Sequence, residues 1–298
     1  MSLWLPTAPC TPAGCAAHRG TKGRGATAGR LAAGIIAVLA GVLLAPLTAL
    51  LPAAGRRRLT RLWARWVLRA FGVRIRVTGV PPATGGPLLV VANHISWLDI
   101  PLVAAVLPGR MLAKTEVRHW PVLGPLAARG GTLFLDRDRL RALPGTVRQI
   151  ADALTGGARV IVFPEGSTWC GRAQGRFRPA TFQAALDASA TVQPVRISYA
   201  PTGPAAFVGD DPLTASLWRI AATGAITAEI RILPPIPVGR HPDRRSLARA
   251  AQHAVGGDGP DLVPQRAVAS DSANRPAVSV HQCVSSSWAA ASSARTPS

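Results

Sequence analysis

The sequence predicts an α/β fold, a mixed sheet of about seven strands flanked by helices. The first observation is that short apolar runs alternate with helical patterns after residue 72. The second is the composition: 48% of the 298 residues are hydrophobic and 16% are charged. Such a chain can bury a sizeable core, which excludes disorder throughout.

The individual elements follow from the local patterns. The seven expected strands are Val73–Val77, Pro87–Ala92, Arg110–Ala113, Thr132–Leu135, Arg159–Phe163, Val192–Tyr199 and Ile226–Leu233. The helices expected between them are Leu98–Leu107, Arg139–Leu154, Pro179–Ala190 and Leu213–Ala222. A last helix near Asp243–Val255 is expected to close the domain.

Composition divides the chain into four parts. Residues 1–30 contain four basic residues and no acid among Gly, Pro, Ala and Thr, which predicts a disordered basic leader. Residues 31–71 are expected to form a membrane anchor and residues 72–255 the α/β domain. From residue 256 to 298 the composition turns to Ser, Ala, Pro and Gly, which predicts a disordered tail.

The first half of the anchor is an uncharged stretch from Leu31 to Ala54. Its 24 residues would form a helix of about 36 Å, enough for a hydrocarbon core of roughly 30 Å. Pro46 and Pro52 favour a kink or an early end, so both a full span and a re-entrant element fit. A buried core helix and a signal peptide are the alternatives, but the arginines that follow at 56–58 disfavour export.

The second half of the anchor is predicted to be an amphipathic helix in the membrane interface. Apolar side chains recur at helical spacing from Leu59 to Phe71 and include Trp63 and Trp66, while arginines occupy the other face. The alternative is a helix packed on its own domain. Eight arginines between Arg56 and Arg76 place the rest of the chain on the cytoplasmic side of the cell membrane, if the apolar stretch spans it.

The net charge of +20 calls for an anionic partner, either a membrane surface or nucleic acid. The arginines concentrate beside the apolar stretch, and no RNP-like, zinc or helix-turn-helix signature is present, which favours an anionic membrane over nucleic acid. The four cysteines include no CxxC pair, so neither a zinc finger nor a thioredoxin-type motif is expected.

The first candidate site is the turn that follows the strand Pro87–Ala92. His94 lies five positions before Asp99 across a strand-to-helix turn, so the carboxylate can reach the imidazole. It would fix the tautomer and stabilise the imidazolium when the histidine takes a proton. The alternative is that Asp99 merely caps the helix, which fits Pro101 two residues later.

Two further strand ends carry polar groups. Arg137 follows the strand Thr132–Leu135 and can offer a bidentate fork to a phosphate; the alternative is a surface turn with Asp136. Glu165 follows the strand Arg159–Phe163 and could accept a substrate hydroxyl, while Gly166 would let backbone N–H groups approach an anion. The alternative there is an ordinary Pro-Glu-Gly turn.

Together these blocks resemble those of the glycerolipid acyltransferase family, the lysophosphatidic acid acyltransferases. Residues 93–99 resemble its NHxxxxD block, residues 131–137 its GxxFIDR block, residues 163–166 the start of FPEGTRS, and residues 192–195 the VPV block. Residues 111–116 and 121–124 are similar to the stretch between the first two blocks. The resemblance covers about residues 60–235 and implies a glycerol-3-phosphate acyltransferase-like fold, with residues 72–255 as the acyltransferase domain.

The resemblance also implies a reaction and a set of roles. His94 would be the general base on the acceptor hydroxyl, oriented by Asp99, and the hydroxyl would attack an acyl thioester directly. The donor would be acyl-CoA or acyl-carrier protein, with no cofactor and no metal. Lys114 and Arg137 would hold the acceptor's phosphate, Glu165 and Gly166 its glycerol region, and Pro194 would shape the acyl or acceptor pocket. Ser167 and Thr168 complete the implied substrate-binding residues.

Thr168 departs from the pattern, because the family usually has arginine there. The resemblance implies lysophosphatidic acid as the lysolipid acceptor, which would give phosphatidic acid. The threonine leaves a lyso-ornithine lipid as the alternative acceptor. Some family members with threonine at this place use the latter. A basic non-catalytic lipid- or nucleic-acid-binding protein is the alternative from a different class.

Overall fold

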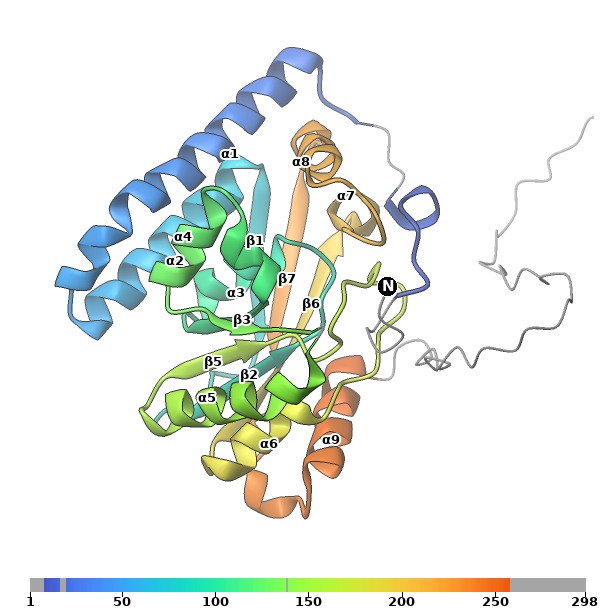
Figure 1. Ribbon diagram of the computed structural model, residues 1–298. Helices are drawn as coiled ribbons and strands as arrows, with labels where there is room; N and C mark the ends of the chain where they lie inside the picture. Colours follow the sequence, from blue (N-terminus) through green and yellow to red (C-terminus); the bar gives the residue numbers. More distant parts are fainter. Residues whose placement is uncertain (1–7, 17–19, 138, 258–298) are drawn as a thin grey trace, which may run out of the picture. The chain divides into compact units, whose positions relative to one another are not determined.

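The computed structural model describes residues 8–16, 20–137 and 139–257. Within these residues the chain forms a seven-stranded mixed sheet, as the sequence predicts (Figure 1). The strands are β1 (Val73–Gly79), β2 (Leu88–Ala92), β3 (Arg110–Lys114), β4 (Leu133–Leu135), β5 (Arg159–Val162), β6 (Thr191–Ala200) and β7 (Ile226–Ile232). The predicted tail, residues 256–298, lies outside the described residues from 258 onward.

The strand order across the sheet is β1-β7-β6-β2-β5-β3-β4. Every neighbouring pair is parallel except β6 with β7, so five strands run in one direction and β1 and β7 run in the other. The five co-directional strands end at one edge of the sheet, where α/β folds place their ligand sites.

Helices cover both faces of the sheet, and strand β2 shows why. Leu88, Val90 and Ala92 point into one hydrophobic core, whereas Leu89 and Val91 point into the other. The helices on the first face are α1 (Arg24–Leu44), α2 (Ala53–Ala70), α3 (Asp99–Val106) and α8 (Leu213–Ala222). Those on the second are α5 (Leu143–Thr155), α6 (Ala180–Asp187) and α9 (Arg244–Gly256). Two short helices absent from the expected set are α4 (Leu123–Arg129) and α7 (Thr202–Ala205).

The apolar stretch does not form one helix to Ala54. Helix α1 ends at Leu44, a short 3₁₀ turn (Pro46–Leu50) follows, and α2 begins after Pro52. The two prolines explain the break, since each lacks the N–H that a continuing helix requires. Helix α1 is nevertheless about 32 Å long by its 21 residues and is apolar enough to cross a membrane.

Helix α1 also begins earlier than the predicted leader allows. Residues 24–30 are helical, so the expectation of a disordered leader is wrong for them. It is also wrong for Pro12–Ala16, which form a helical turn, while residues 1–7 and 17–19 lie outside the described residues. Arg30 explains part of this order, because its guanidinium donates to the carbonyls of Thr223 and Gly224 at the end of α8, at 2.5 and 2.9 Å.

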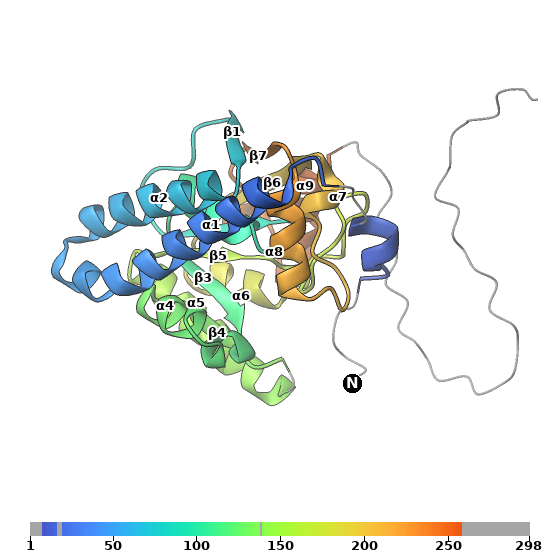
Figure 2. The ribbon, with the colours of Figure 1, turned by 90° about the horizontal axis from the view of Figure 1, so that it is seen from above.

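Helices α1 and α2 pack side by side as a hairpin (Figure 2). Small residues on α1 let two aromatic side chains approach: the indole of Trp63 on α2 lies against Gly41, and the ring of Phe71, directly after α2, lies against Gly34. Trp63 Nε1 also donates to the carbonyl of Ala37 at 2.8 Å. The apolar residues predicted to face the membrane are thus divided between core and surface. Val67 and Phe71 are buried in the domain, whereas Leu62 and Trp66 are exposed.

Candidate active site

The carboxyl ends of the parallel strands bring four of the predicted site residues to one edge of the sheet. His94 follows β2, Lys114 ends β3, Arg137 follows β4 and Glu165 follows β5. These strands are adjacent and parallel in the order β2-β5-β3-β4, so their ends meet at the same edge. The candidate active site at this edge is built around His94.

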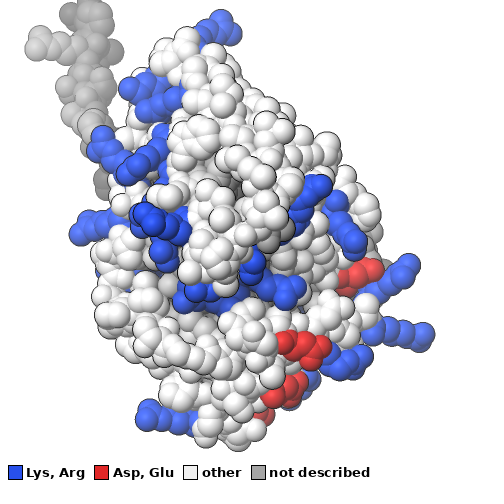
Figure 3. Space-filling model, turned by 90° about the vertical axis from the view of Figure 1, so that its left-hand side faces the viewer, with Lys and Arg blue, Asp and Glu red and all other residues white. Residues whose placement is uncertain are grey.

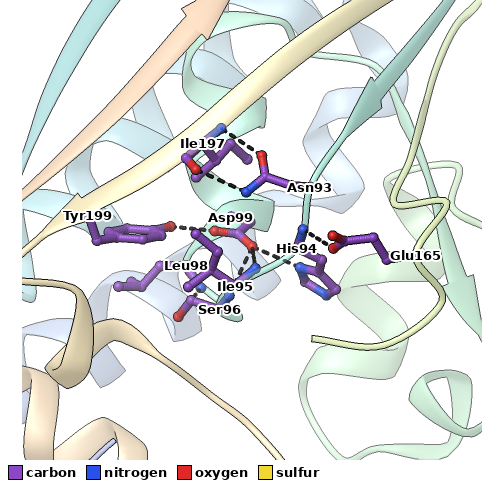
Figure 4. Close-up of polar contacts among 9 residues, drawn as sticks. All are labelled: Asn93, His94, Ile95, Ser96, Leu98, Asp99, Glu165, Ile197 and Tyr199. Carbon is purple, nitrogen blue, oxygen red and sulfur yellow. Dashed lines mark hydrogen bonds and ion pairs between the residues drawn. The ribbon is translucent and has the colours of Figure 1, made fainter. Parts of the chain in front are cut away.

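The turn after β2 holds His94 and Asp99 in contact (Figure 4). His94 Nδ1 and Asp99 Oδ2 are 2.8 Å apart, and the same oxygen accepts the backbone N–H groups of Ile95 at 2.6 Å and Ser96 at 2.9 Å. Asp99 makes no side-chain capping bond to α3, so the capping alternative does not describe it. The carboxylate is fully buried and is used to fold the turn and to orient the imidazole.

Tyr199 is a member of this network that the sequence analysis did not single out. Its hydroxyl, near the end of β6, donates to Asp99 Oδ1 at 2.5 Å. Burial and the negative charge of Asp99 raise the pKa of Tyr199 well above its usual range, which keeps the hydroxyl protonated as a donor. Both oxygens of Asp99 are therefore satisfied without substrate.

Asn93 connects β2 to β6 beside the same network. Its side-chain amide donates to the carbonyl of Ile197 at 2.9 Å, and its oxygen accepts the N–H of Ile197 at 2.8 Å. Asn93 thus continues the strand pairing by one position after β2 has ended, and it fixes where the His94 turn begins.

Glu165 acts on the backbone of His94 in this structure. Its carboxylate is fully buried and accepts the N–H of His94 at 2.6 Å and the N–H of Gly175 at 3.0 Å. Burial raises the pKa of Glu165 to about 8, although these two donors oppose the shift. In this conformation the carboxylate is used within the protein, and its contact with the acceptor's glycerol stays a prediction.

The imidazole of His94 is held on its other sides as well. It stacks on Phe163, with ring centroids 4.2 Å apart, and its backbone carbonyl accepts the N–H of Trp169 at 2.7 Å. The His94 side chain remains 20% exposed. Within the described chain its Nε2 makes no hydrogen bond, so this nitrogen is the one available to a reacting hydroxyl.

Two cations lie further along the edge. Arg137 donates to the carbonyl of Gly166, which places it beside the Glu165 turn. Burial lowers the pKa of Arg137 and Glu116 opposes that shift, but a guanidinium stays charged at neutral pH. The ammonium of Lys114 is exposed and lies over the ring of Trp120, 5.9 Å from its centroid.

The remaining predicted residues differ in placement. Gly166 has a φ of +76°, which the turn after β5 requires, and Ser167 and Thr168 follow it half-buried. Pro194 is buried within β6 opposite Val91, one residue before the end of β2 and three residues before His94, and its part in shaping a substrate pocket stays a prediction.

Cys170 lies close to this edge in sequence but is not directed at His94. Its thiol belongs to a cluster with Cys10 and Cys15. Hydrogen bonding from the Cys10 thiol lowers the pKa of Cys170 to about 5, whereas burial raises that of Cys15. No hydroxyl or thiol in the described residues hydrogen-bonds to His94, so the geometry fits a base that acts directly on substrate.

The acyltransferase family model matches residues 74–198, which include the His94 turn, Arg137 and the Glu165 turn. The lyso-ornithine lipid O-acyltransferase of Pseudomonas aeruginosa is 41% identical over 208 residues, which are 67% of this chain and 78% of that protein. The chain belongs to the acyltransferase family. The 1-acyl-sn-glycerol-3-phosphate acyltransferase of Neisseria meningitidis is 33% identical over 195 residues, 64% of this chain and 76% of that protein.

A solved structure supports the same fold for this acyltransferase. The 1-acyl-sn-glycerophosphate acyltransferase of Thermotoga maritima superposes with a TM-score of 0.50 at 22% identity, over 76% of this chain and 94% of that one. The predicted family, fold and enzyme class are thereby confirmed. Membership of an enzyme family argues against the alternative of a non-catalytic basic binding protein.

Proposed function

We propose that this acyltransferase transfers an acyl chain from an acyl thioester to the free hydroxyl of a lysolipid. The observation that carries the proposal is the His94–Asp99 pair, in which Nδ1 lies 2.8 Å from the carboxylate and Nε2 makes no hydrogen bond to any described residue. Nε2 takes the hydroxyl proton as the oxygen attacks the thioester carbonyl. Asp99 stabilises the imidazolium, which then returns the proton to the departing thiolate. General-base assistance of this kind is worth about 10²–10⁴ in rate.

The first candidate acceptor is lysophosphatidic acid. Lys114 and Arg137, at the ends of β3 and β4, are the cations we assign to its phosphate. The turn from Gly166 to Thr168 lies beside Arg137 and would shape the acceptor's polar end. Acyl-CoA and acyl-carrier protein are the two donors of suitable chemistry, and an activated thioester needs no metal or cofactor for this transfer.

A second acceptor, a lyso-ornithine lipid, is favoured by Thr168. An uncharged residue stands where the family usually has arginine. Two relatives named lyso-ornithine lipid O-acyltransferase, from Pseudomonas aeruginosa and Brucella abortus, are 41% and 36% identical to this chain. The two acceptors share the attacking hydroxyl, so the His94 chemistry is the same for both.

The α1–α2 hairpin is the proposed attachment to the membrane. Large apolar residues on it are exposed to solvent; they are Ile35, Ile36, Leu39, Leu43, Leu44, Leu47, Leu50, Leu62 and Trp66. The face in Figure 3 carries Lys and Arg in several groups, while Asp and Glu gather along one side. Lipid tails would cover the apolar side chains, and the basic groups would face an anionic leaflet on the cytoplasmic side.

The test is acyl transfer from labelled acyl-CoA by membranes containing the protein. Lysophosphatidic acid and a lyso-ornithine lipid are offered separately, with membranes that contain the His94→Ala variant as the blank. Transfer to the first acceptor assigns phosphatidic acid synthesis, and transfer only to the second moves the acceptor without changing the mechanism. If neither acceptor is acylated, from acyl-CoA or from acyl-carrier protein, the proposed function is wrong.

A further inference from the structure

Three cysteines that are far apart in sequence meet in one cluster. Cys10 and Cys15 lie before α1, and Cys170 lies in the loop after β5. Their sulfur atoms are all within 4.8 Å of one another. The side chains of Cys10 and Cys170 are buried and that of Cys15 is partly exposed, so solvent reaches the cluster from one side.

The segment between Cys10 and Cys15 folds into a tight turn that directs both thiols the same way. The N–H of Cys15 donates to the carbonyl of Thr11 at 3.0 Å, and the N–H of Gly14 to Thr11 Oγ1 at 3.3 Å. The carbonyl of Gly14 accepts from Arg172, which joins this turn to the loop of Cys170. A C-x₄-C pair on a turn, with a third cysteine from a distant loop, is a common arrangement of thiolate metal ligands.

The surroundings of the cluster are apolar. Trp169, Ala206 and Val208 are buried against the cysteines, and Ala16 packs on the same group. Cysteine can serve simply as a small apolar side chain, and that is the plain alternative for any one of them. Packing alone does not require three thiols to converge on one another, whereas a shared metal ion does. The clustering within the described residues involves sulfur only, which selects soft or borderline cations over Mg²⁺ or Ca²⁺.

We propose that Cys10, Cys15 and Cys170 form a zinc-binding site that fastens the N-terminal segment to the loop after β5. Each thiol would lose its proton on binding, and three thiolates with one water would complete four-coordination. Zn–S bonds of about 2.3 Å set tetrahedral sulfur atoms about 3.8 Å apart. The sulfurs therefore need to approach by about 1 Å at most, which side-chain rotation can supply.

The site would also support the catalytic turn. Cys170 follows Trp169 directly, and the Trp169 N–H donates to the carbonyl of His94 at 2.7 Å. A zinc ion at Cys170 would hold this loop, and with it one of the contacts that position His94. The ion lies outside the reacting groups, so its loss should slow acyl transfer without abolishing it.

The test measures zinc in the full-length protein purified without chelator, by elemental analysis. One zinc per chain is expected in the wild type and in Cys283→Ser, which is the matched control because it removes the one cysteine outside the cluster. Cys10→Ser, Cys15→Ser and Cys170→Ser should each reduce the zinc content to well under half. Equal zinc content in all five proteins, or a zinc-free wild type that binds no added Zn²⁺ when its thiols are reduced, would overturn the proposal.

A second readout separates metal loss from misfolding. The exposed Lys22 offers trypsin a site between the cluster and α1. Chelation should speed cleavage there in the wild type and in Cys283→Ser, and it should have no added effect in Cys170→Ser, while circular dichroism stays unchanged in all three. A disulfide between two cluster cysteines in protein kept under reducing conditions, found by mass spectrometry, would also contradict the zinc site.

Discussion

The edge of the sheet and the α1–α2 hairpin depart from the usual distribution of polar and apolar side chains in opposite ways. At the edge, the carboxylates of Asp99 and Glu165 are fully buried. On the hairpin, Ile36 is 58% exposed, Leu43 77% and Leu50 83%. Buried polar groups and exposed apolar patches are the two informative exceptions to inside-apolar packing.

The two regions differ in what offsets the free-energy cost of burying a carboxylate or of exposing an apolar side chain to water. A buried carboxylate is costly unless donors satisfy it, and Asp99 accepts four hydrogen bonds while Glu165 accepts two. Nothing in the described chain covers the hairpin's apolar side chains, and lipid would remove that cost. Chemistry and membrane attachment therefore reside in separate regions, so each should be breakable without the other.

Apart from the loss of His94 itself, the largest effect is expected from Asp99→Asn. The amide oxygen can still accept from the backbone donors of Ile95 and Ser96, but the imidazole loses the negative charge that stabilises its protonated form. We expect acyl transfer to fall roughly a hundredfold or more, with membrane attachment unchanged. The matched control is Asp187→Asn on α6, which is exposed. Full activity in Asp99→Asn would show that the carboxylate does not act through His94.

Glu165→Gln is expected to have a smaller effect on activity, of about tenfold, because one of two backbone N–H groups loses its acceptor. The variant also tests a pH effect. Burial raises the pKa of Glu165 to about 8 from an ordinary value of about 4.3, so the folded protein favours the neutral form. That contribution to stability is complete below about pH 4 and is lost as the pH rises through about 8.

Thermal unfolding between pH 5 and pH 9 should therefore show a decline in the wild type that Glu165→Gln lacks. Glu229→Gln on β7 serves as the control with the same change of charge, and its profile should follow the wild type. Identical profiles for the wild type and Glu165→Gln would mean that the Glu165 carboxyl does not titrate in this range.

Leu43→Asp tests membrane attachment through the α1–α2 hairpin. Placing a carboxylate in the hydrocarbon core costs about 2.5–3.5 kcal/mol, so the fraction of protein on anionic vesicles should fall about tenfold or more. Acyl transfer by this variant to a detergent-dispersed lysolipid should persist. His253→Asp, also exposed and also in the last turn of its helix, makes the same change of charge on α9. Equal sedimentation of the two variants with vesicles would contradict attachment through α1.

The smallest effect is expected from Tyr199→Phe. It removes one donor to Asp99 Oδ1 and leaves the three contacts to Oδ2. A lost hydrogen bond to a buried charge costs about 1.5–3 kcal/mol of stability, with a loss of activity of a few fold. Chemical denaturation and transfer rates measure the two quantities. A loss of activity as large as that of Asp99→Asn would give the hydroxyl a part in the reaction itself.

Local patterns predicted the strands and the central pair of residues. All seven expected strands are present within a few residues of their predicted ends, because apolar runs bounded by turn residues determine them locally. The pairing of His94 with Asp99 could be predicted for the same reason, because two residues five positions apart across a single turn meet without help from distant segments. The two prolines also marked correctly where the apolar stretch breaks.

Contacts between distant segments were beyond the sequence. Tyr199 reaches Asp99 only through the pairing of β6 with β2, and Glu165 reaches the backbone of His94 only through the pairing of β2 with β5. The same cause hid the cysteine cluster, where the C-x₄-C pair was the available signal and its third member is 155 positions further along the sequence. The helical start of α1 depends on Arg30 meeting the end of α8, which no local pattern records.

The central claim is that His94 Nε2 removes the proton of the acceptor hydroxyl. The most direct test is the rate of acyl transfer by His94→Ala with and without added imidazole, alongside His119→Ala, whose side chain is exposed. We expect the rate to fall by about 10²–10⁴ in His94→Ala, to recover in part as the imidazole concentration rises, and to stay unchanged in His119→Ala. A His94→Ala protein that transfers acyl chains at the wild-type rate would contradict it.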